Sequence, residues 1–387
     1  MADIVRQHRH ELEARGKLSN QQRRALSAIA ICRTSALGGH LEECRSCGLK
    51  QPAYNSCRNR HCPKCQGLQQ EQWIAARSER ILPIPHFHVV FTLPSELRGL
   101  ARYLPKLIYD AFFHATADTL LQLGQQRLGA ELGVTLVLHT WTRELRHHPH
   151  LHAIVTCGGL SLDGTRWVPG SRKYLFPVAA MSKLLRAKMM ASLSRMHDRA
   201  ELDGFDDFRD PEGFDRFMRK LRSIDWVTYA KRPFRRADHV LRYLGRYTHR
   251  VAISNSRLLS VTDQLVTFRT RNGRTASLHP VEFLARFVQH VLPAGFVKIR
   301  HYGLYSGSHV HTRLAHAREL LTPRPSTSSD PPDNPQGSWI ERLRSLTGRD
   351  ARRCPLCGAE LIRTTVLSPT ARSPPRSADS DRIPTPA

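Results

Sequence analysis

Two histidines separated by one apolar residue are the part of this sequence that most directly indicates chemistry. His150 and His152 flank Leu151, and the residues that follow, Ala153 to Val155, are apolar. In a β-strand, residues i and i+2 face the same side, so the two imidazoles would point together. Neutral imidazole is the commonest protein ligand for a metal ion. The pattern predicts a metal-binding strand, and an ordinary strand with two surface histidines is the alternative.

Two tyrosines one helical turn apart are candidate nucleophiles. Tyr243 and Tyr247 stand at i and i+4 in a segment whose apolar residues are spaced for one helical face. Arg242, Arg246 and Arg250 recur at the same interval. A helix that presents two phenols beside three guanidinium groups suits a phosphodiester substrate. Tyrosines that cap a core beside exposed arginines would show the same spacing.

The nine cysteines are clustered in pairs, which in a cytosolic chain indicates metal binding rather than disulfides. Two Cys-x-x-Cys pairs with fourteen residues between them are close to the zinc-ribbon pattern. The predicted ligands of one zinc ion are Cys44, Cys47, Cys62 and Cys65. Four further residues could build a second zinc site: Cys32, His40, Cys57 and His61. A third pair, Cys354 and Cys357, cannot fill a tetrahedral site by itself, and the sequence does not identify its partners.

The charge balance indicates a polyanionic partner. The chain of 387 residues has 59 Lys and Arg against 33 Asp and Glu, which gives a formal net charge of +26. Nucleic acid is the first candidate for so basic a protein. No run of 18 apolar residues is present, so we expect no membrane partner. The polar N-terminus lacks the apolar stretch of a signal peptide, which favours a cytoplasmic location.

Strands and helices must position these residues. Residues 134–141 predict a strand that pairs with the histidine strand as an antiparallel hairpin. His139, near the end of that strand, would lie opposite His150 and His152 and could be a third metal ligand, or a buried histidine bonded to the backbone. Residues 86–94 predict another strand, whose His86 and His88 we interpret as structural. Helices are expected at 1–40, 95–130, 181–222 and 281–288.

Several motifs, in order, resemble those of a known family. His150-Leu151-His152 is similar to the His-hydrophobic-His motif of the HUH endonucleases. Within these, residues 25–320 resemble the two-tyrosine rolling-circle transposases of the insertion sequence ninety-one type. The resemblance rests on the segments 57–66, 88–94, 138–141, 148–152, 243–247 and 300–303.

The resemblance implies an α+β fold, with a small zinc-binding domain before an HUH endonuclease core in which helices flank an antiparallel sheet. It implies bacterial, nucleoid-associated transposition by a rolling-circle route, with cleavage of single-stranded DNA at transposon ends and target through a 5′-phosphotyrosine. By position, His150 and His152 take the metal-ligand role and Tyr243 and Tyr247 the nucleophile role. The motif leaves the third ligand open, and His139 is the candidate.

The chemistry expected from these residues needs two kinds of metal. A catalytic Mg²⁺ or Mn²⁺ would orient the scissile phosphate, and structural Zn²⁺ would hold the cysteines. A tyrosine would attack the phosphate and release a 3′-hydroxyl, and two tyrosines would allow two successive strand transfers. The predicted DNA contacts are Lys231, Arg242, Arg246 and Arg250.

Five segments and two rival functions complete the expectations. The segments are a helical lead-in and zinc-binding domain (1–80), the HUH catalytic domain (81–321), a disordered linker (322–337), a small Cys-x-x-Cys segment (338–366) and a disordered Pro/Ser-rich tail (367–387). A plasmid replication initiator or relaxase would share the nicking core. A zinc-dependent DNA-binding protein without catalysis would share only the cysteines and the charge.

Overall fold

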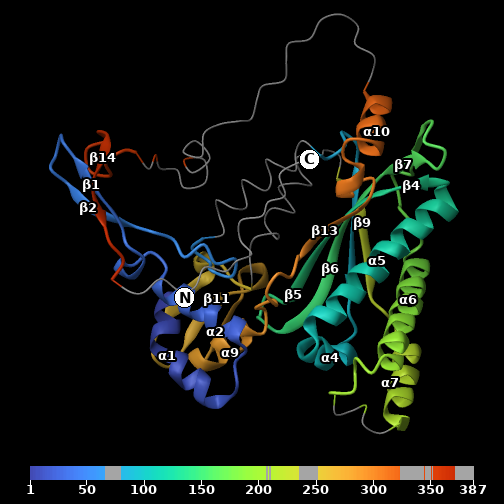
Figure 1. Cartoon of the computed structure of the whole chain (residues 1–387), viewed down its shortest axis with the longest axis horizontal. Helices are drawn as coiled ribbons and strands as arrows, with labels where there is room; N and C mark the ends of the chain where they lie inside the picture. The colour runs from blue at the N-terminus through green and yellow to red at the C-terminus, as the bar shows by residue number, and fades with distance from the viewer. Residues whose placement is uncertain are drawn as a thin grey trace, which may run out of the picture.

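A five-stranded antiparallel sheet carries the histidine strand at its centre (Figure 1). The computed structural model describes residues 1–65, 80–205, 208, 211–234, 252–322, 344, 350 and 352–370. In spatial order the strands are β13 (Ile299–Gly303), β5 (Gly133–Trp141), β6 (His147–Thr156), β3 (His86–Thr92) and β9 (Thr228–Phe234). β5 and β6 form the expected hairpin, in which His139 pairs with His150 and Val137 with His152.

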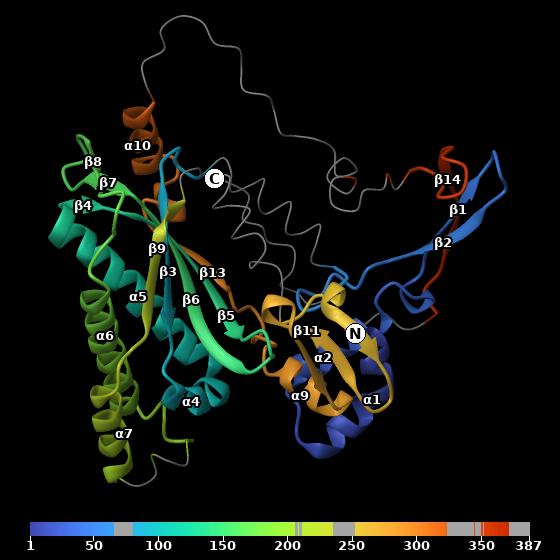
Figure 2. The ribbon, with the colours of Figure 1, turned by 180° about the vertical axis from the view of Figure 1, so that it is seen from behind.

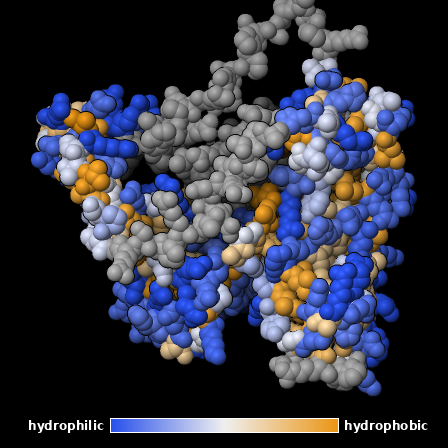
Figure 3. Space-filling model, in the orientation of Figure 1, coloured by the Kyte–Doolittle hydropathy of each residue, from blue (hydrophilic) through white to orange (hydrophobic). Residues whose placement is uncertain are grey.

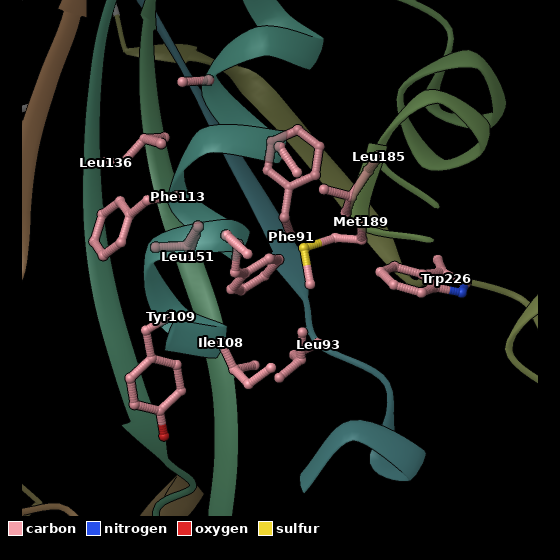
Figure 4. Packing of buried hydrophobic residues seen from close by; sticks show 14 of the residues in the cluster. Phe91, Leu93, Ile108, Tyr109, Phe113, Leu136, Leu151, Leu185, Met189 and Trp226 are labelled. Carbon is pink, nitrogen blue, oxygen red and sulfur yellow. The ribbon is translucent and has the colours of Figure 1, made fainter. Parts of the chain in front are cut away.

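Helices cover one face of this sheet. They are α4 (Arg98–Tyr103), α5 (Pro105–Leu128), α6 (Val178–Asp198) and α7 (Pro211–Ser223). Figure 2 shows α5, α6 and α7 together on one side of the strands. Alternate strand residues, such as Phe91, Leu136 and Leu151, are fully or almost fully buried in the core beneath the helices, close to Leu185 and Met189 of α6 (Figure 4). Because side chains alternate along a strand, the residues between these face the other side of the sheet.

The helical region expected over 95–130 is divided into η2 (Ser95–Leu97), α4 and α5, and local sequence explains where α5 begins and ends. Pro105 occupies the first turn, where the missing N–H of proline costs no hydrogen bond. Gly129 ends the helix in the left-handed region at φ 64°, and its N–H donates to the carbonyl of Gln125. Between them the helix buries aromatic residues, including Phe112 and Phe113, against the sheet.

A second lobe is built from two parts of the chain that are far apart in the sequence. The first helices, α1 (Ala2–Arg15) and α2 (Asn20–Ile31), share one apolar core with α9 (Pro280–Val288) and the sheet of β10 (Leu258–Val261), β11 (Val266–Arg269) and β12 (Thr275–Leu278). The expectation of a single catalytic domain over 81–321 is therefore wrong in one respect. The segment 252–288 packs on the N-terminal helices, because the apolar face of α9 is buried there and not on the five-stranded sheet.

A small three-stranded sheet projects from this lobe (Figure 1). Its order is β14-β1-β2, with β1 (Gly39–Cys44) between β14 (Leu361–Leu367) and β2 (Lys50–Tyr54). The expected separate segment 338–366 is thus corrected: its strand completes a sheet with residues near the N-terminus. The helical structure expected over residues 1–40 also ends earlier than predicted, since α2 ends at Ile31 and a strand begins at Gly39.

The remaining elements are short connections at the edges of the sheets. They are the strands β4 (Ala130–Glu131), β7 (Gly158–Ser161) and β8 (Trp167–Pro169), the helix α10 (Arg313–Leu321), and the 3₁₀ turns η1 (Ser35–Leu37), η2 (Ser95–Leu97), η4 (Asn255–Arg257), η5 (Arg271–Gly273) and η6 (Gly307–His309). Figure 3 shows a mainly hydrophilic surface on the viewed face of the molecule. Within the described part of the chain, no helix has the length and apolar character needed to cross a membrane.

Candidate functional site

Three histidines converge on the face of the sheet opposite α4, α5, α6 and α7. His139 of β5 and His150 and His152 of β6 present ligand nitrogens that all lie within 4.8 Å of one another. Their ring centroids are 5.3 Å apart for His139 and His150, and 4.4 Å for His139 and His152. We call these three residues the His cluster. The pairing of neighbouring strands brings them together, since His139 stands directly opposite His150 in the register.

Hydrogen bonds orient two of the three rings. The Nδ1 of His150 lies 2.7 Å from the carbonyl oxygen of His148, to which it donates, so His150 presents Nε2 as its lone-pair nitrogen. The Nδ1 of His152 lies 2.8 Å from Nε2 of His88, which belongs to the neighbouring strand β3. Bonds of this kind fix the tautomer and direction of a ligating imidazole. The ring of Trp141 stacks on His139 at 4.6 Å between centroids.

Burial keeps the imidazoles of His88, His150 and His152 neutral at neutral pH. Desolvation lowers the pKa of His150 to about 4, and the hydrogen bond to the His148 carbonyl offsets part of this effect. Desolvation, and then the charges of Lys231 and His150, lower the pKa of His88 to about 4. Desolvation also lowers the pKa of His152 well below its ordinary value, with repulsion from His139 next. A neutral imidazole keeps the lone pair that a metal needs, so this donor set fits a divalent cation.

Strand β9 extends this face beyond the histidines. Tyr229 pairs with Val90 and Lys231 with His88, so both side chains lie on the side of the sheet that bears the His cluster. Both are exposed, and Tyr229 keeps 56% of its surface open to solvent. An exposed phenol and an exposed ammonium beside a metal site could hold a base and a phosphate of a nucleic acid. Phe234, at the end of β9, lies 6.3 Å from the ring of His88.

The expected nucleophiles lie outside the described residues. This applies to Tyr243 and Tyr247, and to the arginines Arg242, Arg246 and Arg250. Of the predicted DNA contacts, Lys231 is described, and it stands on the same face as the His cluster.

The cysteines form two clusters, and neither has the predicted membership. Cys62 and Cys65 meet Cys32 and Cys57, whereas Cys44 and Cys47 meet Cys354 and Cys357. In each group the four sulfur atoms lie within 4.8 Å of one another. We call them the inner thiol cluster (Cys32, Cys57, Cys62, Cys65) and the outer thiol cluster (Cys44, Cys47, Cys354, Cys357).

The predicted single site of Cys44, Cys47, Cys62 and Cys65 is therefore wrong. Strand β2 separates its two halves, because it lies between Cys47 and Cys57 and carries the chain from the end of the hairpin that bears Cys44 back to the other end. The second predicted set placed Cys32 with Cys57, and the structure also brings these two together. Their partners are Cys62 and Cys65, not His40 and His61.

The two histidines proposed for that second set serve other purposes. His40 Nε2 lies 3.2 Å from a carboxylate oxygen of Glu42 on the same strand. His61 is fully buried, and its Nε2 accepts a hydrogen bond from the backbone N–H of Leu292 at 3.2 Å. His61 thus fastens the inner thiol cluster to the segment that leads into β13.

Sequence reasoning missed the role of His88. It had been interpreted as structural, and the structure places it against His152 at hydrogen-bonding distance. The available signal was its own His-x-His pair on a predicted strand. The sequence did not indicate which strands would be neighbours, so the contact could not be derived.

Comparison with known proteins gives consistent results across most of the chain. Residues 4–93 match the family described as "Transposase zinc-binding domain", and residues 133–313 match the family Y2_Tnp, described as "Putative transposase". The chain is 41% identical over 395 residues to "Putative transposase y4qJ" of Sinorhizobium fredii, covering 98% of both chains. It is 28% identical over 384 residues to the transposase for insertion sequence element IS801 of Pseudomonas savastanoi pv. phaseolicola, covering 93% of this chain and 87% of that protein. No solved structure matches the chain.

Proposed function

The chain belongs to the IS91-type transposases with an N-terminal zinc-binding domain, and we propose that it nicks and rejoins single-stranded DNA through a tyrosine-linked intermediate. Transposase activity itself implies cleavage and transfer of DNA strands. The proposal adds the kind of strand, the nucleophile and the metal. The observation that carries it is the convergence of His139, His150 and His152 on the face of the sheet opposite α4, α5, α6 and α7.

The His cluster would hold a divalent cation, Mg²⁺ or Mn²⁺. When bound, such a cation supplies positive charge that polarises a phosphodiester oxygen. The protein's own part is to present neutral imidazoles in a fixed direction, which it does through His148 and His88. Lys231 and Tyr229, on the same face, would position the phosphate backbone and a base of the bound strand.

Tyr243 and Tyr247 would supply the nucleophiles. The phenol oxygen of one tyrosine attacks the scissile phosphorus, a new P–O bond joins the 5′ end to the protein, and the bond to the 3′ oxygen breaks to release a 3′-hydroxyl. Reversal with another 3′-hydroxyl rejoins the strand without ATP, because one phosphodiester replaces another. Eight residues lie between Phe234 and Tyr243, and the nine steps from one to the other span at most about 30 Å. Phe234 borders His88, so this distance allows either phenol to meet the His cluster.

The test is formation of a covalent complex on labelled single-stranded DNA that carries an end of the element. With Mg²⁺, the native chain should yield a protein–DNA adduct that survives denaturation. Tyr243→Phe with Tyr247→Phe should abolish the adduct, and Tyr174→Phe, at an exposed tyrosine between β8 and α6, is the matched control that should keep it. Each single variant should retain some cleavage and lose complete strand transfer. An adduct that persists in the double variant would overturn the nucleophile assignment.

A parallel measurement tests the metal. His152→Ala should abolish the cleavage that Mg²⁺ or Mn²⁺ supports. DNA binding in a gel-shift assay should persist. Undiminished cleavage by His152→Ala would sink the metal assignment and leave the family membership intact. Element ends, rather than plasmid origins, as the preferred substrate separate a transposase from a replication initiator.

A further inference from the structure

Two strands far apart in the sequence, β1 and β14, pair in the small projecting sheet. Strand β14 pairs with β1 in antiparallel register, with Cys44 opposite Leu361. This brings Cys357 to Cys44, with 3.4 Å between the sulfur atoms, and Cys354 to Cys47, with 3.6 Å. The residues in each of these contacts are more than 300 positions apart in the sequence. Both views of the ribbon show β14 beside β1 (Figures 1 and 2).

The two halves of the outer thiol cluster have the same local geometry. In each, a glycine follows the second cysteine in the left-handed region, Gly48 at φ 73° and Gly358 at φ 76°. The N–H of each glycine donates to the carbonyl of the first cysteine at 2.9 Å, Cys44 in one half and Cys354 in the other. This turn sends both thiols of a Cys-x-x-Cys pair to one side, which is the knuckle found in zinc ribbons.

The projecting sheet has little else to hold it together. Of its three strands, β14 exposes most of its side chains, and β2 has none that is fully buried. Among the described side chains of β1 and of residues 352–370, Cys44 and Cys354 are the ones that belong to the buried apolar set. A sheet of three short strands without an apolar core needs a cross-link or a metal to persist in water.

We infer that Cys44, Cys47, Cys354 and Cys357 form a zinc site that clasps the C-terminal strand to the N-terminal module. Four thiolates in a compact group suit tetrahedral Zn²⁺. With the inner thiol cluster, the chain would bind two zinc ions. The inference assigns a role to the unpartnered Cys354–Cys357 pair, which lies outside both matched family regions. It does not depend on the proposed strand-cleavage chemistry.

Zinc content of the purified full-length chain tests the site directly. The native protein should contain two zinc ions per chain by elemental analysis. Cys354→Ser with Cys357→Ser should contain one, and Cys157→Ser should keep two because Cys157 is buried away from both clusters. Two zinc ions in the Cys354/Cys357 variant would overturn the inference. One zinc ion in the native chain and one in the variant would overturn it as well. X-ray absorption should show sulfur ligands at about 2.3 Å.

Thiol titration separates a metal site from a pair of disulfides. In denaturant with a chelator and no reductant, all nine cysteines should react if the outer cluster holds zinc. Two disulfides in that cluster would consume four thiols and leave five of the nine. Five reactive thiols would therefore overturn the zinc assignment.

A cleavable linker tests the clasp. A protease site placed between residues 330 and 336 would divide the chain after purification. The C-terminal piece should stay attached on gel filtration while zinc is present, and should separate after chelation or in the Cys354→Ser, Cys357→Ser variant. A piece that leaves the zinc-loaded native protein would show that no clasp exists.

Discussion

At the scale of single residues, the candidate site depends on how imidazoles are directed as much as on which are present. His150 and His152 share a face because strand residues alternate, and His139 joins them through strand pairing. His88 adds a hydrogen bond to His152 and also lies beside Lys231 in the register. We propose that His88 positions His152 for the metal.

We predict that His88→Ala lowers metal-dependent strand cleavage by about 10- to 100-fold, the usual cost of losing a partner of a metal ligand. The Mg²⁺ concentration needed for half-maximal cleavage should rise at the same time. His88→Gln keeps a hydrogen-bonding side chain and should recover part of both quantities. Equal losses in the two variants, with no change in metal requirement, would point to a purely structural role.

Lys231 is predicted to contact a phosphate, and salt dependence can measure this. Each phosphate contact to a single strand contributes about −0.7 to the slope of the logarithm of the binding constant against the logarithm of salt concentration. Lys231→Ala should make that slope shallower by about one such contribution. Lys183, exposed on α6 over the helix-covered face, is the matched control. A Lys183→Ala slope that falls as much as that of Lys231→Ala would contradict the assignment.

At the scale of elements, buried polar contacts join the hairpin that carries the His cluster to the lobe that carries the inner thiol cluster. His147, at the start of β6, bonds to the hydroxyl of Tyr109 on α5 at 3.0 Å and stacks on His290. The Nε2 of His290 donates to the carbonyl of Leu145, and the hydroxyl of Thr140 donates to its Nδ1.

Further along the same segment, Arg60 donates to the carbonyls of Pro293 and Phe296. Together with the His61 bond to Leu292, these contacts dock the loop of the inner thiol cluster close to β13. Loss of zinc from that cluster should therefore loosen an edge of the five-stranded sheet as well as the N-terminal lobe.

Buried His290 predicts a loss of stability in mild acid. Desolvation, partly offset by the bond to Leu145, lowers its pKa to about 4 from an ordinary value of 6.5. Between these two pKa values the imidazole is protonated in the unfolded chain and neutral in the folded chain. The contribution of neutral His290 to the free energy of unfolding is therefore complete above pH 6.5 and is lost as the pH falls toward 4. The linkage amounts to about 2 kcal/mol between pH 7.5 and 5.

Unfolding by denaturant at several pH values measures this contribution. The difference in unfolding free energy between the native chain and His290→Gln should shrink by about that amount as the pH falls from 7.5 to 5. A difference that stays constant across this range would show that the neutral imidazole is not what the fold requires.

The edge strand β13 ends at Gly303, where a side chain would be strained. Gly303 lies in the left-handed region at φ 58°, and a Cβ there would stand 2.0 Å from the carbonyl oxygen of Leu132. Gly129, at φ 64°, has the same backbone conformation with no atom within 4 Å of such a Cβ. Thermal or denaturant unfolding of the two alanine variants therefore separates the clash from the conformation.

We expect Gly129→Ala to cost about 1 kcal/mol, the penalty of the left-handed region alone. Gly303→Ala should cost clearly more, because the backbone at the β5 edge has to move. Equal losses of stability would show that β13 adjusts without strain.

At the scale of the whole molecule, the chain is not ordered in space as it is in sequence. Residues 252–288 pack in the core of the N-terminal lobe and not on the five-stranded sheet. Strand β14 pairs with β1 in the small sheet that also contains β2. The zinc-binding region and the sheet with the His cluster therefore hold each other in place. A substitution that destabilises one of them is expected to destabilise the other.

The large positive charge also belongs to this scale. With a formal net charge of +26, the affinity for any nucleic acid should fall as salt rises. Comparing single-stranded with double-stranded DNA at one salt concentration is therefore needed to reveal a preference for single strands. An affinity that does not change with salt would argue that phosphate contacts are not the main source of binding.

The sequence by itself determined what depends on short spacing. Alternation along a strand placed His150 and His152 on one side, and the hairpin with residues 134–141 followed from two apolar runs joined by a polar turn. Helix boundaries at Pro105 and Gly129 follow from the backbone limits of those two residues. Each of these features is a consequence of neighbours within about ten residues.

The tertiary structure decided what depends on distant partners. All thiols are chemically alike, so spacing could pair Cys44 and Cys47 with Cys62 and Cys65 as readily as with Cys354 and Cys357; strand pairing between β1 and β14 made the choice. The partnership of His88 with His152 likewise depended on which strands became neighbours. Contacts of this kind are selected by burial and register over the whole chain, and no local pattern records them.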